Sequence, residues 1–467
     1  MADLSGLVGR CGEIARDLTR LASEGRKILV VTHIDADGIA SGSIIFASLR
    51  RRGANVALRA LPELDGRAVE RLSSQRYELL IFTDLASGMV GEISALGSRY
   101  LIVDHHQIQP EFLGNEAVLN AWQFGIDGGK ESCSSTVAYI LARSIDDRNR
   151  DLSPLAVVGA VADRQDGGPG RSLTGLNRLP LEDALSSGLV SVSKDLLLTG
   201  RETRPVHESI ANTSYPYIPG LTGSKDQSLS ALLQAGIKLK EDGRWRTVSE
   251  LSSDEKKKVV EIIAGAFQPG SGGEDAISSL IGEVYTLNFE DAFTPLRDAR
   301  EFATLLNACG RMGEPALGAA ICLGDRMDSL KLATKVLSDY RQAINRAIQG
   351  ILTDATRLEQ RGRAVLVRGD GVVDERLLGP VTSILTSSPS FKDKVVVART
   401  KSGETELKVS SRVGDSFSGE VNLGAVMREA ALAVQGVGGG HSMAAGAKIP
   451  LVKADDFARM VLEMIQA

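Results

Sequence analysis

Short apolar runs alternate with amphipathic stretches along the first part of the chain. Residues 4–21 place apolar side chains at three- and four-residue steps, which is the spacing of one apolar face on a helix. Continuous apolar runs follow and predict five strands, at Ile28–Val31, Val56–Leu58, Leu79–Phe82, Leu101–Val103 and Val118–Leu119. Strands that are apolar on both faces and separated by helical stretches are typical of a parallel sheet covered by helices.

The pattern changes after about residue 170. Two helical stretches, at about 227–240 and 248–266, precede a glycine-rich connection at 268–273. A proline-free stretch at about 327–360 predicts one long helix. At ~1.5 Å per residue such a helix could span roughly 50 Å and link two domains across a cleft.

A β pattern returns in the last quarter of the chain. Strands are predicted at Ala364–Val367, Val395–Arg399 and Glu406–Val409, with helices near 421–433 and 453–466. We therefore predict an α/β protein with an N-terminal parallel-sheet domain and a smaller C-terminal α/β domain, joined by a long helix, with a helical insertion between. The expected parts are a first domain at 1–170, its remainder with the insertion at 171–325, the connecting helix at 326–361 and the C-terminal domain at 362–467.

Composition narrows the classes of function. Hydrophobic residues make up 43% and charged residues 24%, as in ordinary globular proteins. An aromatic content of 4% argues against a binding surface built mainly from base-stacking rings. The net charge of −5 excludes a globally basic binder but leaves room for a local basic cleft.

The cysteines and the apolar runs indicate where the protein works. Four cysteines lie far apart without a C-x-x-C pair, which excludes a zinc ribbon and favours a reducing compartment. No apolar run approaches the ~20 residues that a membrane helix needs, and the N-terminus has no signal-peptide core. We expect a cytoplasmic protein without a membrane partner.

Metal-type ligands gather in four clusters that we expect at strand ends. They are the segments around His33, Asp35 and Asp37, the single Asp84, the run Asp104-His105-His106, and Asp163. Alone, each aspartate could cap a helix. Together, so many carboxylates on one sheet edge would repel one another and raise their pKa values unless cations lay among them.

The donor types indicate which cations these would be. Carboxylates with imidazoles and no thiolate suit Mn²⁺, with Mg²⁺ as a substitute, better than structural zinc. Two such ions can bind a phosphate oxygen and activate a water for phosphodiester cleavage. A carboxylate must then bridge both ions, and Asp84, alone after its strand, is the natural candidate.

The four clusters resemble, in order and spacing, the motifs of the DHH phosphoesterase superfamily. The resemblance implies one set of metal ligands, namely His33, Asp35, Asp37, Asp84, His105 and Asp163. It also implies that His106 holds the scissile phosphate and that Asp104 orients the histidine pair. The spacing of the first motif is closer to RecJ nucleases than to inorganic pyrophosphatases.

A glycine-rich segment near the C-terminus resembles the motif of the DHH-associated domain. Its candidate substrate-binding residues are Gly438, Gly439, Gly440 and His441. Glycines let backbone N–H groups approach a phosphate closely, whereas a lone glycine cluster would usually be a turn.

Basic residues on two adjacent predicted strands extend this candidate surface. Arg399 lies on one strand, and period-two alternation puts Lys408, Ser410 and Arg412 on one face of the next, where they could follow a phosphate backbone. The alternative is a solvated edge that discourages aggregation.

Two further short segments are candidates. Asn307 to Arg311 resembles an Asn-Ala-x-Gly-Arg element of RecJ nucleases, which implies that Asn307 and Arg311 contact substrate. The segment Cys133–Thr136 opens a helix, either as an N-cap or as a phosphate contact. Arg164 and Asp166 either steady the metal site or form a local ion pair.

The resemblance implies an exonuclease on single-stranded DNA, with RNA as a second substrate, acting in DNA replication or repair. The stretch Arg297–Phe302 resembles the archaeal RecJ-like branch, which implies the GINS complex or other replisome proteins as partners. The alternatives are an oligoribonuclease or cyclic-dinucleotide phosphodiesterase, and a replisome scaffold related to RecJ. Loss of metal ligands would be the mark of a scaffold, and here every ligand is present.

Overall fold

The computed structural model describes residues 3–95, 97–268, 273–414 and 416–466. The chain divides into two compact units. The first comprises the chain up to Ser209 with Lys238–Lys258 and Ile277–Leu337, and the second comprises Ile210–Ile237, Val259–Ala276 and the chain from Ser338 onward.

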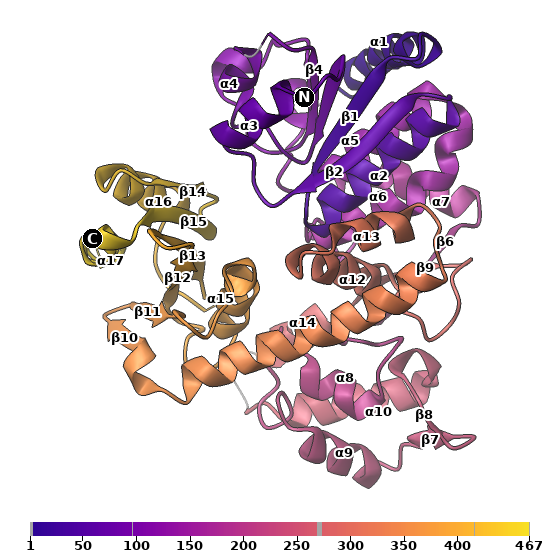
Figure 1. Ribbon diagram of the computed structural model, residues 1–467. Coiled ribbons are helices and arrows are strands. Elements are labelled where there is room, and N and C mark those ends of the chain that lie inside the picture. The colour runs from indigo at the N-terminus through magenta and orange to yellow at the C-terminus, as the bar shows by residue number, and fades with distance from the viewer. Residues whose placement is uncertain (1–2, 96, 269–272, 415, 467) are drawn as a thin grey trace. The chain divides into compact units, whose positions relative to one another are not determined.

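The first unit is built on a five-stranded sheet in which every neighbouring pair is parallel (Figure 1). In spatial order its strands are β2 (Asn55–Leu61), β1 (Lys27–His33), β3 (Leu79–Thr83), β4 (Tyr100–Asp104) and β5 (Val118–Asn120). The five predicted strands are thus confirmed. Because all five run the same way, their carboxyl ends lie along one edge of the sheet.

Helices cover both faces of this sheet, as the apolar strands require (Figure 1). On one face α3 (Gly66–Ser73) and α4 (Val90–Ser94) pack against the side chains of β1, β3 and β4. The other helices of this part are α1 (Leu4–Ser23), α2 (Ala36–Arg51), α5 (Ser134–Ile145), α6 (Ser153–Ala162) and α7 (Arg178–Ser186). Of these, α2 contacts β1 and α5 contacts β4, and both are buried along most of their length.

The middle of the chain is helical, with two short strand pairs that the hydrophobic pattern did not predict. The strand pairs are β6 (Val190–Leu196) with β9 (Ile281–Leu287), and β7 (Lys240–Glu241) with β8 (Arg244–Trp245), both antiparallel. The helices are α8 (Val206–Asn212), α9 (Lys225–Gln234), α10 (Ser253–Gly265), α11 (Gly273–Leu280), α12 (Ala299–Arg311) and α13 (Pro315–Cys322). The predicted connection at 268–273 lies largely outside the described residues.

One long helix, α14 (Asp328–Leu352), follows in sequence and is shorter than predicted. The helix was expected to reach about residue 360. Instead, Asp354 caps a 3-10 turn at Ala355–Arg357, and the next residues pair as a strand with the segment that follows. The strand pairing takes the backbone hydrogen bonds that a longer helix would have used.

The second unit contains a six-stranded mixed sheet. In spatial order its strands are β10 (Leu358–Arg361), β11 (Ala364–Arg368), β12 (Val395–Ser402), β13 (Glu406–Val413), β15 (Ala444–Pro450) and β14 (Val437–Gly440). Helices α16 (Leu423–Ala433) and α17 (Ala454–Gln466) share an apolar core with one face of the sheet. Helix α15 (Leu378–Thr386) packs on β12 and β13. Among the described residues, no helix is long and apolar enough to cross a membrane.

Candidate metal centre

The carboxyl edge of the parallel sheet brings three of the predicted clusters together. His33 ends β1, Asp84 directly follows β3, and Asp104 ends β4. Strand β1 lies between β2 and β3, and β3 lies between β1 and β4. The three residues therefore come from three adjacent strands, and the topology alone places them side by side.

The turn from β1 into α2 supplies the next two ligands. Asp35 is the N-cap of α2, and one of its carboxylate oxygens accepts a hydrogen bond of 2.9 Å from the backbone N–H of Gly38. A Cβ atom on Gly38 would lie 2.5 Å from the carbonyl oxygen of His33, so this tight turn requires glycine. The turn presents Asp35 and Asp37 to the sheet edge.

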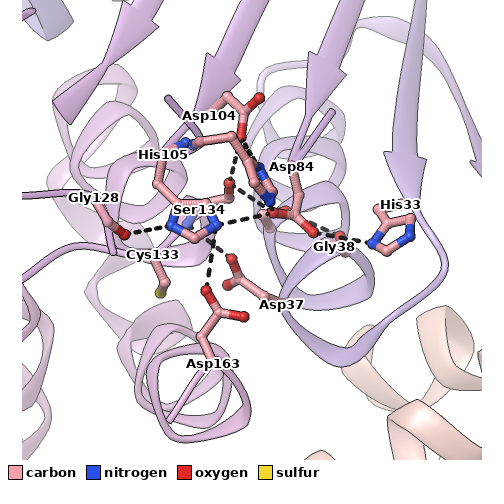
Figure 2. Close-up of polar contacts among 12 residues, drawn as sticks. His33, Asp37, Gly38, Asp84, Asp104, His105, Gly128, Cys133, Ser134 and Asp163 are labelled. Carbon is pink, nitrogen blue, oxygen red and sulfur yellow. Dashed lines mark hydrogen bonds and ion pairs between the residues drawn. The ribbon is translucent and has the colours of Figure 1, made fainter. Parts of the chain in front are cut away.

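Asp84 lies between two histidines that belong to different clusters (Figure 2). Its Oδ2 is 3.4 Å from Nδ1 of His33, and its Oδ1 is 3.4 Å from Nε2 of His105. Asp84 is buried, and its φ of 59° lies in the left-handed region, which a non-glycine residue adopts only where its surroundings hold it there. Each carboxylate oxygen thus faces a different group of ligands.

These groups are distinct sets of donors that could each hold one ion. Within the described residues, the sets with mutually close ligand atoms are His33–Asp35–Asp84, Asp37–His105–Asp163, and Asp84–Asp104–His105–His106. We call the first two the outer and inner ligand groups. Asp84 belongs to the outer group and touches the inner group through His105, which is the arrangement that a bridging carboxylate needs.

Asp163 was expected after a strand, but it caps the C-terminal end of helix α6 instead. The apolar run before it is buried over most of the helix surface, and such a run cannot be told from a buried strand by periodicity alone. The side chain nevertheless reaches the sheet edge, where Oδ2 lies 3.3 Å from Nε2 of His105 (Figure 2).

The start of helix α5 holds the carboxylate of Asp37. The backbone N–H groups of Ser134 and Ser135 donate to its two oxygens at 2.8 and 2.9 Å, and the Ser135 hydroxyl donates to one of them as well. A helix N-terminus favours such a negative group. Of the two roles predicted for Cys133–Thr136, the N-cap position is confirmed, because Cys133 is the N-cap residue of α5, without a side-chain cap hydrogen bond. In addition, the helix N-terminus anchors a metal ligand.

His106 is held by Asp104, which lies behind the metal ligands. Nδ1 of His106 is 2.9 Å from Oδ1 of Asp104, so Nδ1 donates and Nε2 is left to face solvent on a side chain that is 49% exposed. Burial opposes protonation, but the Asp104 carboxylate outweighs it and raises the pKa of His106 to about 9. His106 is therefore a cationic group at the rim of the site.

Without cations, burial and neighbouring carboxylates disfavour the ionised forms of two of the predicted ligands, Asp37 and Asp163. Burial raises the pKa of Asp37 to about 6, and the neighbouring Asp84 adds to this rise. Burial, with Asp37 and Asp84 nearby, also holds the pKa of Asp163 well above its usual range. Burial would lower the pKa of His33, but Asp35 and Asp84 outweigh it and hold this pKa high.

The donor set fits divalent cations of the Mn²⁺ or Mg²⁺ type. It consists of carboxylate oxygens and imidazole nitrogens. Cys133 is adjacent, but burial raises the pKa of its thiol well above the usual value, so it offers no thiolate. Ions between the two ligand groups would offset the repulsion among the aspartates.

Comparison with known protein families agrees with this site. Residues 27–162 match the DHH family, N-terminal domain, residues 198–281 match the DHH-CID domain, and residues 372–467 match the DHHA1 domain. The chain therefore contains a DHH domain, a DHH-CID domain and a DHHA1 domain. The first match covers the sheet edge with all the predicted ligands except Asp163.

Two related sequences cover the chain to different extents. The uncharacterized protein MJ0831 of Methanocaldococcus jannaschii is 28% identical over 445 residues, which are 94% of this chain and 93% of that protein. The single-stranded-DNA-specific exonuclease RecJ of Bacillus subtilis is 27% identical over 163 residues, which are 32% of this chain and 21% of RecJ.

Solved structures share the fold at low sequence identity. RecJ from Thermus thermophilus in complex with Mn²⁺ aligns with a TM-score of 0.59 and 17% identity over 97% of this chain, but this chain spans only 54% of that protein. Cdc45 from Entamoeba histolytica aligns with a TM-score of 0.66 and 12% identity over 98% of this chain and 99% of that one.

The Asn307–Arg311 segment contacts the loop between His33 and Asp37. The side-chain oxygen of Asn307 accepts a hydrogen bond of 3.1 Å from the backbone N–H of Ala36, between two ligands. A Cβ on Gly310 would lie 1.6 Å from the carbonyl oxygen of Ile34. The structure thus supports a positioning role for Asn307, and substrate contact by Arg311, which ends α12, stays a prediction.

The basic residues of the DHHA1 domain lie on two faces of its sheet. Lys408, Ser410 and Arg412 share the face on which α15 packs, and a Cβ on Gly379 of α15 would lie 3.9 Å from Nη2 of Arg412. Arg399 pairs in register with Val409 on the opposite face, 3.6 Å from Asp370. One phosphate track therefore cannot contain all four residues, and Ser410 is itself buried.

The three glycines of strand β14 differ in their surroundings. A Cβ on Gly438 would lie 2.3 Å from the carbonyl oxygen of Met427 in α16, and a Cβ on Gly440, with φ of 139°, would lie 2.6 Å from that of Ala444. Close packing thus explains these two glycines. Gly439 has open space around it, so it is the glycine best placed for a ligand to approach.

Several residues around the metal site escaped the sequence reasoning. Gly128, Gln165 and Asn177 form buried hydrogen bonds behind His105, and Trp122 donates from its indole N–H to the His105 carbonyl at 2.9 Å. For Asp166, a local ion pair was one of the two predicted roles, and it is confirmed with Arg171 and Arg300 as the partners. The only available signal for Gln165 was that it closely follows Asp163.

Proposed function

We propose that this chain is an exonuclease that hydrolyses phosphodiester bonds at the end of single-stranded DNA and releases mononucleotides. The DHH match and the ligand cluster support a metal-dependent phosphodiesterase with a RecJ-like fold. The single observation that carries the proposal is Asp84, whose two oxygens face the outer and inner ligand groups.

The residues divide the work of hydrolysis among them. The outer and inner ligand groups would hold two Mn²⁺ ions, with Mg²⁺ as a substitute. This choice of metal is supported by the structures of RecJ from Thermus thermophilus, which contain Mn²⁺ or Mg²⁺. When bound, such ions supply Lewis acidity at the phosphate and a water that ionises near neutral pH. His106, fixed by Asp104, can donate from Nε2 to a non-bridging phosphate oxygen.

The polymer would be held by residues of the DHHA1 domain and of α12. Lys408, Arg412 and the backbone at Gly439 are the proposed phosphate contacts in the DHHA1 domain, together with His441, two residues after Gly439 in the sequence. Arg311 is the proposed contact in α12. The relative named as a single-stranded-DNA-specific exonuclease supports this choice of substrate, with RNA as a second one.

The decisive experiment is product analysis with single strands labelled at either end. DNA and RNA 20-mers, a dinucleotide and a cyclic dinucleotide are incubated with Mn²⁺ or Mg²⁺, with Asp84→Asn as the inactive control. We expect mononucleotides from the DNA 20-mer. Preference for the dinucleotides would indicate the oligoribonuclease or cyclic-dinucleotide alternative, and no product from any substrate would overturn the proposal.

A second candidate function is a scaffold in a replisome. The likeness to Cdc45 over nearly the whole of both chains favours it, and GINS is the partner that the RecJ-like resemblance implies. The complete ligand set favours catalysis. Binding of purified GINS that is equal for the wild type and Asp84→Asn, without hydrolysis by the wild type, would favour the scaffold.

A further inference from the structure

The carbonyl oxygen of Gly128 is shared by two side chains. Nδ1 of His105 lies 2.6 Å from it, and Nε2 of Gln165 donates to it at 2.9 Å. Because a carbonyl oxygen only accepts, Nδ1 of His105 carries the proton and Nε2 is the nitrogen that faces Asp163 and Asp84 (Figure 2). This carbonyl therefore sets which nitrogen His105 offers to a metal.

Gln165 is fixed by contacts at both ends of its amide. Nε2 also donates to the carbonyl of Ser132 at 3.0 Å, and Oε1 accepts from Nδ2 of Asn177 at 2.6 Å. Asn177 in turn accepts from the Thr136 hydroxyl at 2.7 Å. Gln165 is 2% exposed and Asn177 is fully buried, so water cannot replace these bonds.

The same stretch of chain holds all three members of the inner ligand group. We call residues 128–135 the frame segment. It anchors His105 through Gly128 and Asp37 through Ser134 and Ser135. Its Gly128 and Ser132 carbonyls also accept hydrogen bonds from Gln165. Because Gln165 follows Asp163 by two residues, the frame segment anchors the Asp163 segment as well.

The outer ligand group is positioned by other residues. Asp35 accepts from Gly38, and the loop between His33 and Asp37 is held by Asn307. Within the part of the chain that the structure describes, no hydrogen bond joins the frame segment to His33 or Asp35, whereas Ser134 reaches the bridging Asp84 at 3.1 Å. Apart from the shared Asp84, which Ser134 of the frame segment also contacts, the two ligand groups thus have separate supports.

We propose that Gln165 is a positioning residue that sets the metal affinity of the inner site without touching the metal. Its amide ties the Asp163 segment to the carbonyl that orients His105, so two ligands of one ion keep their spacing. Loss of this amide would loosen the inner site and leave the outer site unchanged. The inference rests on the proposed two-metal site, but not on which nucleic acid is cleaved.

The test measures Mn²⁺ binding by titration calorimetry in two backgrounds of the full chain. His33→Ala leaves the inner site as the competent one, and His105→Ala leaves the outer site. Gln165→Glu is then added to each background. The new side chain keeps an oxygen that accepts from Asn177, but it replaces the NH₂ group that donates to the carbonyls of Gly128 and Ser132 with a second oxygen. We expect a roughly 10–100-fold loss of Mn²⁺ affinity in the His33→Ala background and no change in the His105→Ala background.

A matched control makes the same chemical change elsewhere. Nε2 of Gln123 also bridges two backbone carbonyls, those of Leu113 and Asn115, at 2.9 and 3.2 Å. Gln123→Glu should leave Mn²⁺ affinity unchanged in both backgrounds. If Gln165→Glu does not fold, as judged by circular dichroism, Asn177→Ser removes the donor that fixes the Gln165 amide and should give the same selective loss.

The outcomes separate this inference from the proposed function. Equal loss of affinity in both backgrounds, or no loss in either, overturns the role of Gln165. A wild-type protein that binds two Mn²⁺ ions but cleaves no nucleic acid overturns the exonuclease proposal and leaves the test of Gln165 intact. A wild-type protein that binds no Mn²⁺ overturns both.

Discussion

The edge of the parallel sheet and the sheet of the DHHA1 domain differ in how far their candidate functional residues are exposed to solvent. Asp37, Asp84 and Asp104 are almost fully buried, whereas Lys408, Arg412 and Gly439 lie at partly exposed positions. Buried carboxylates need partners, so each of the three has an assigned contact. Partly exposed lysine and arginine can be satisfied by water, so their positions say less about what they bind.

This difference teaches how much a polar pattern reveals about chemistry. At the sheet edge, the cost of burying charge leaves few explanations apart from bound cations, and the residue types specify them. On the DHHA1 sheet, the partly exposed Lys408 and Arg412 are compatible with a solvated surface. We expect the first region, the edge of the parallel sheet, to control turnover and the second region, the DHHA1 sheet, to control binding.

The largest effect is expected from Asp84→Asn. The amide keeps the size of the side chain but cannot bridge two cations, so turnover at saturating DNA should fall about 10³-fold or more. Single-turnover hydrolysis with Mn²⁺ measures this. Asp151→Asn, which changes an exposed aspartate paired with Arg51, is the control and should keep wild-type turnover. Retention of activity in Asp84→Asn would contradict a bridging role.

A second prediction concerns Mn²⁺ itself. Ions between repelling aspartates should stabilise the DHH domain, by about 2.7 kcal/mol when free Mn²⁺ is 100 times its dissociation constant. Hydrogen exchange of peptides from α2 and β3 should slow with Mn²⁺ and quicken with chelator. Peptides from β12 and β13 serve as the internal control, and equal slowing in both regions would argue against a metal site confined to the sheet edge.

The sequence predicted the first region well because its signals are local. The strands β1 and β3 are built on continuous apolar runs. His33 is the last residue of β1, and Asp84 directly follows β3. Topology then brings them together without further information. Asp163 was placed after a strand and in fact follows a helix, yet its side chain still reaches the site.

The remaining features depend on contacts between distant residues. Strand β14 is mostly glycine and carries no apolar alternation, so no pattern could reveal it. The bonds from Gln165 to Gly128 and from Ser134 to Asp37 join segments 37 and 97 residues apart. Such contacts have no periodicity, and a single sequence contains no sign of them.

Two of the three glycines of β14, Gly438 and Gly439, offer a finer test of the second region. Gly439→Ala adds a methyl group in open space, so the melting temperature should not fall. The methyl group would block the close approach of a phosphate to the backbone, so DNA binding should weaken. Gly438→Ala should instead destabilise the fold by about 1–3 kcal/mol, because its Cβ would clash with the Met427 carbonyl. Differential scanning calorimetry and fluorescence anisotropy separate the two effects. Unchanged binding by Gly439→Ala would remove Gly439 from the proposed surface.

The smallest effect is expected from Arg412→Ala, which removes one proposed phosphate contact. The affinity for single-stranded DNA should fall only a few-fold, but the slope of log K against log salt should become shallower by about 0.7, the value for one phosphate on a single strand. Arg399→Ala is the matched control, because Arg399 lies on the opposite face of the same sheet beside Asp370. If binding follows the face that carries Lys408 and Arg412, only Arg412→Ala changes the slope. If both variants change it equally, the DHHA1 domain attracts the strand through its overall field, and the face predicted from the alternation of Lys408, Ser410 and Arg412 has no special role.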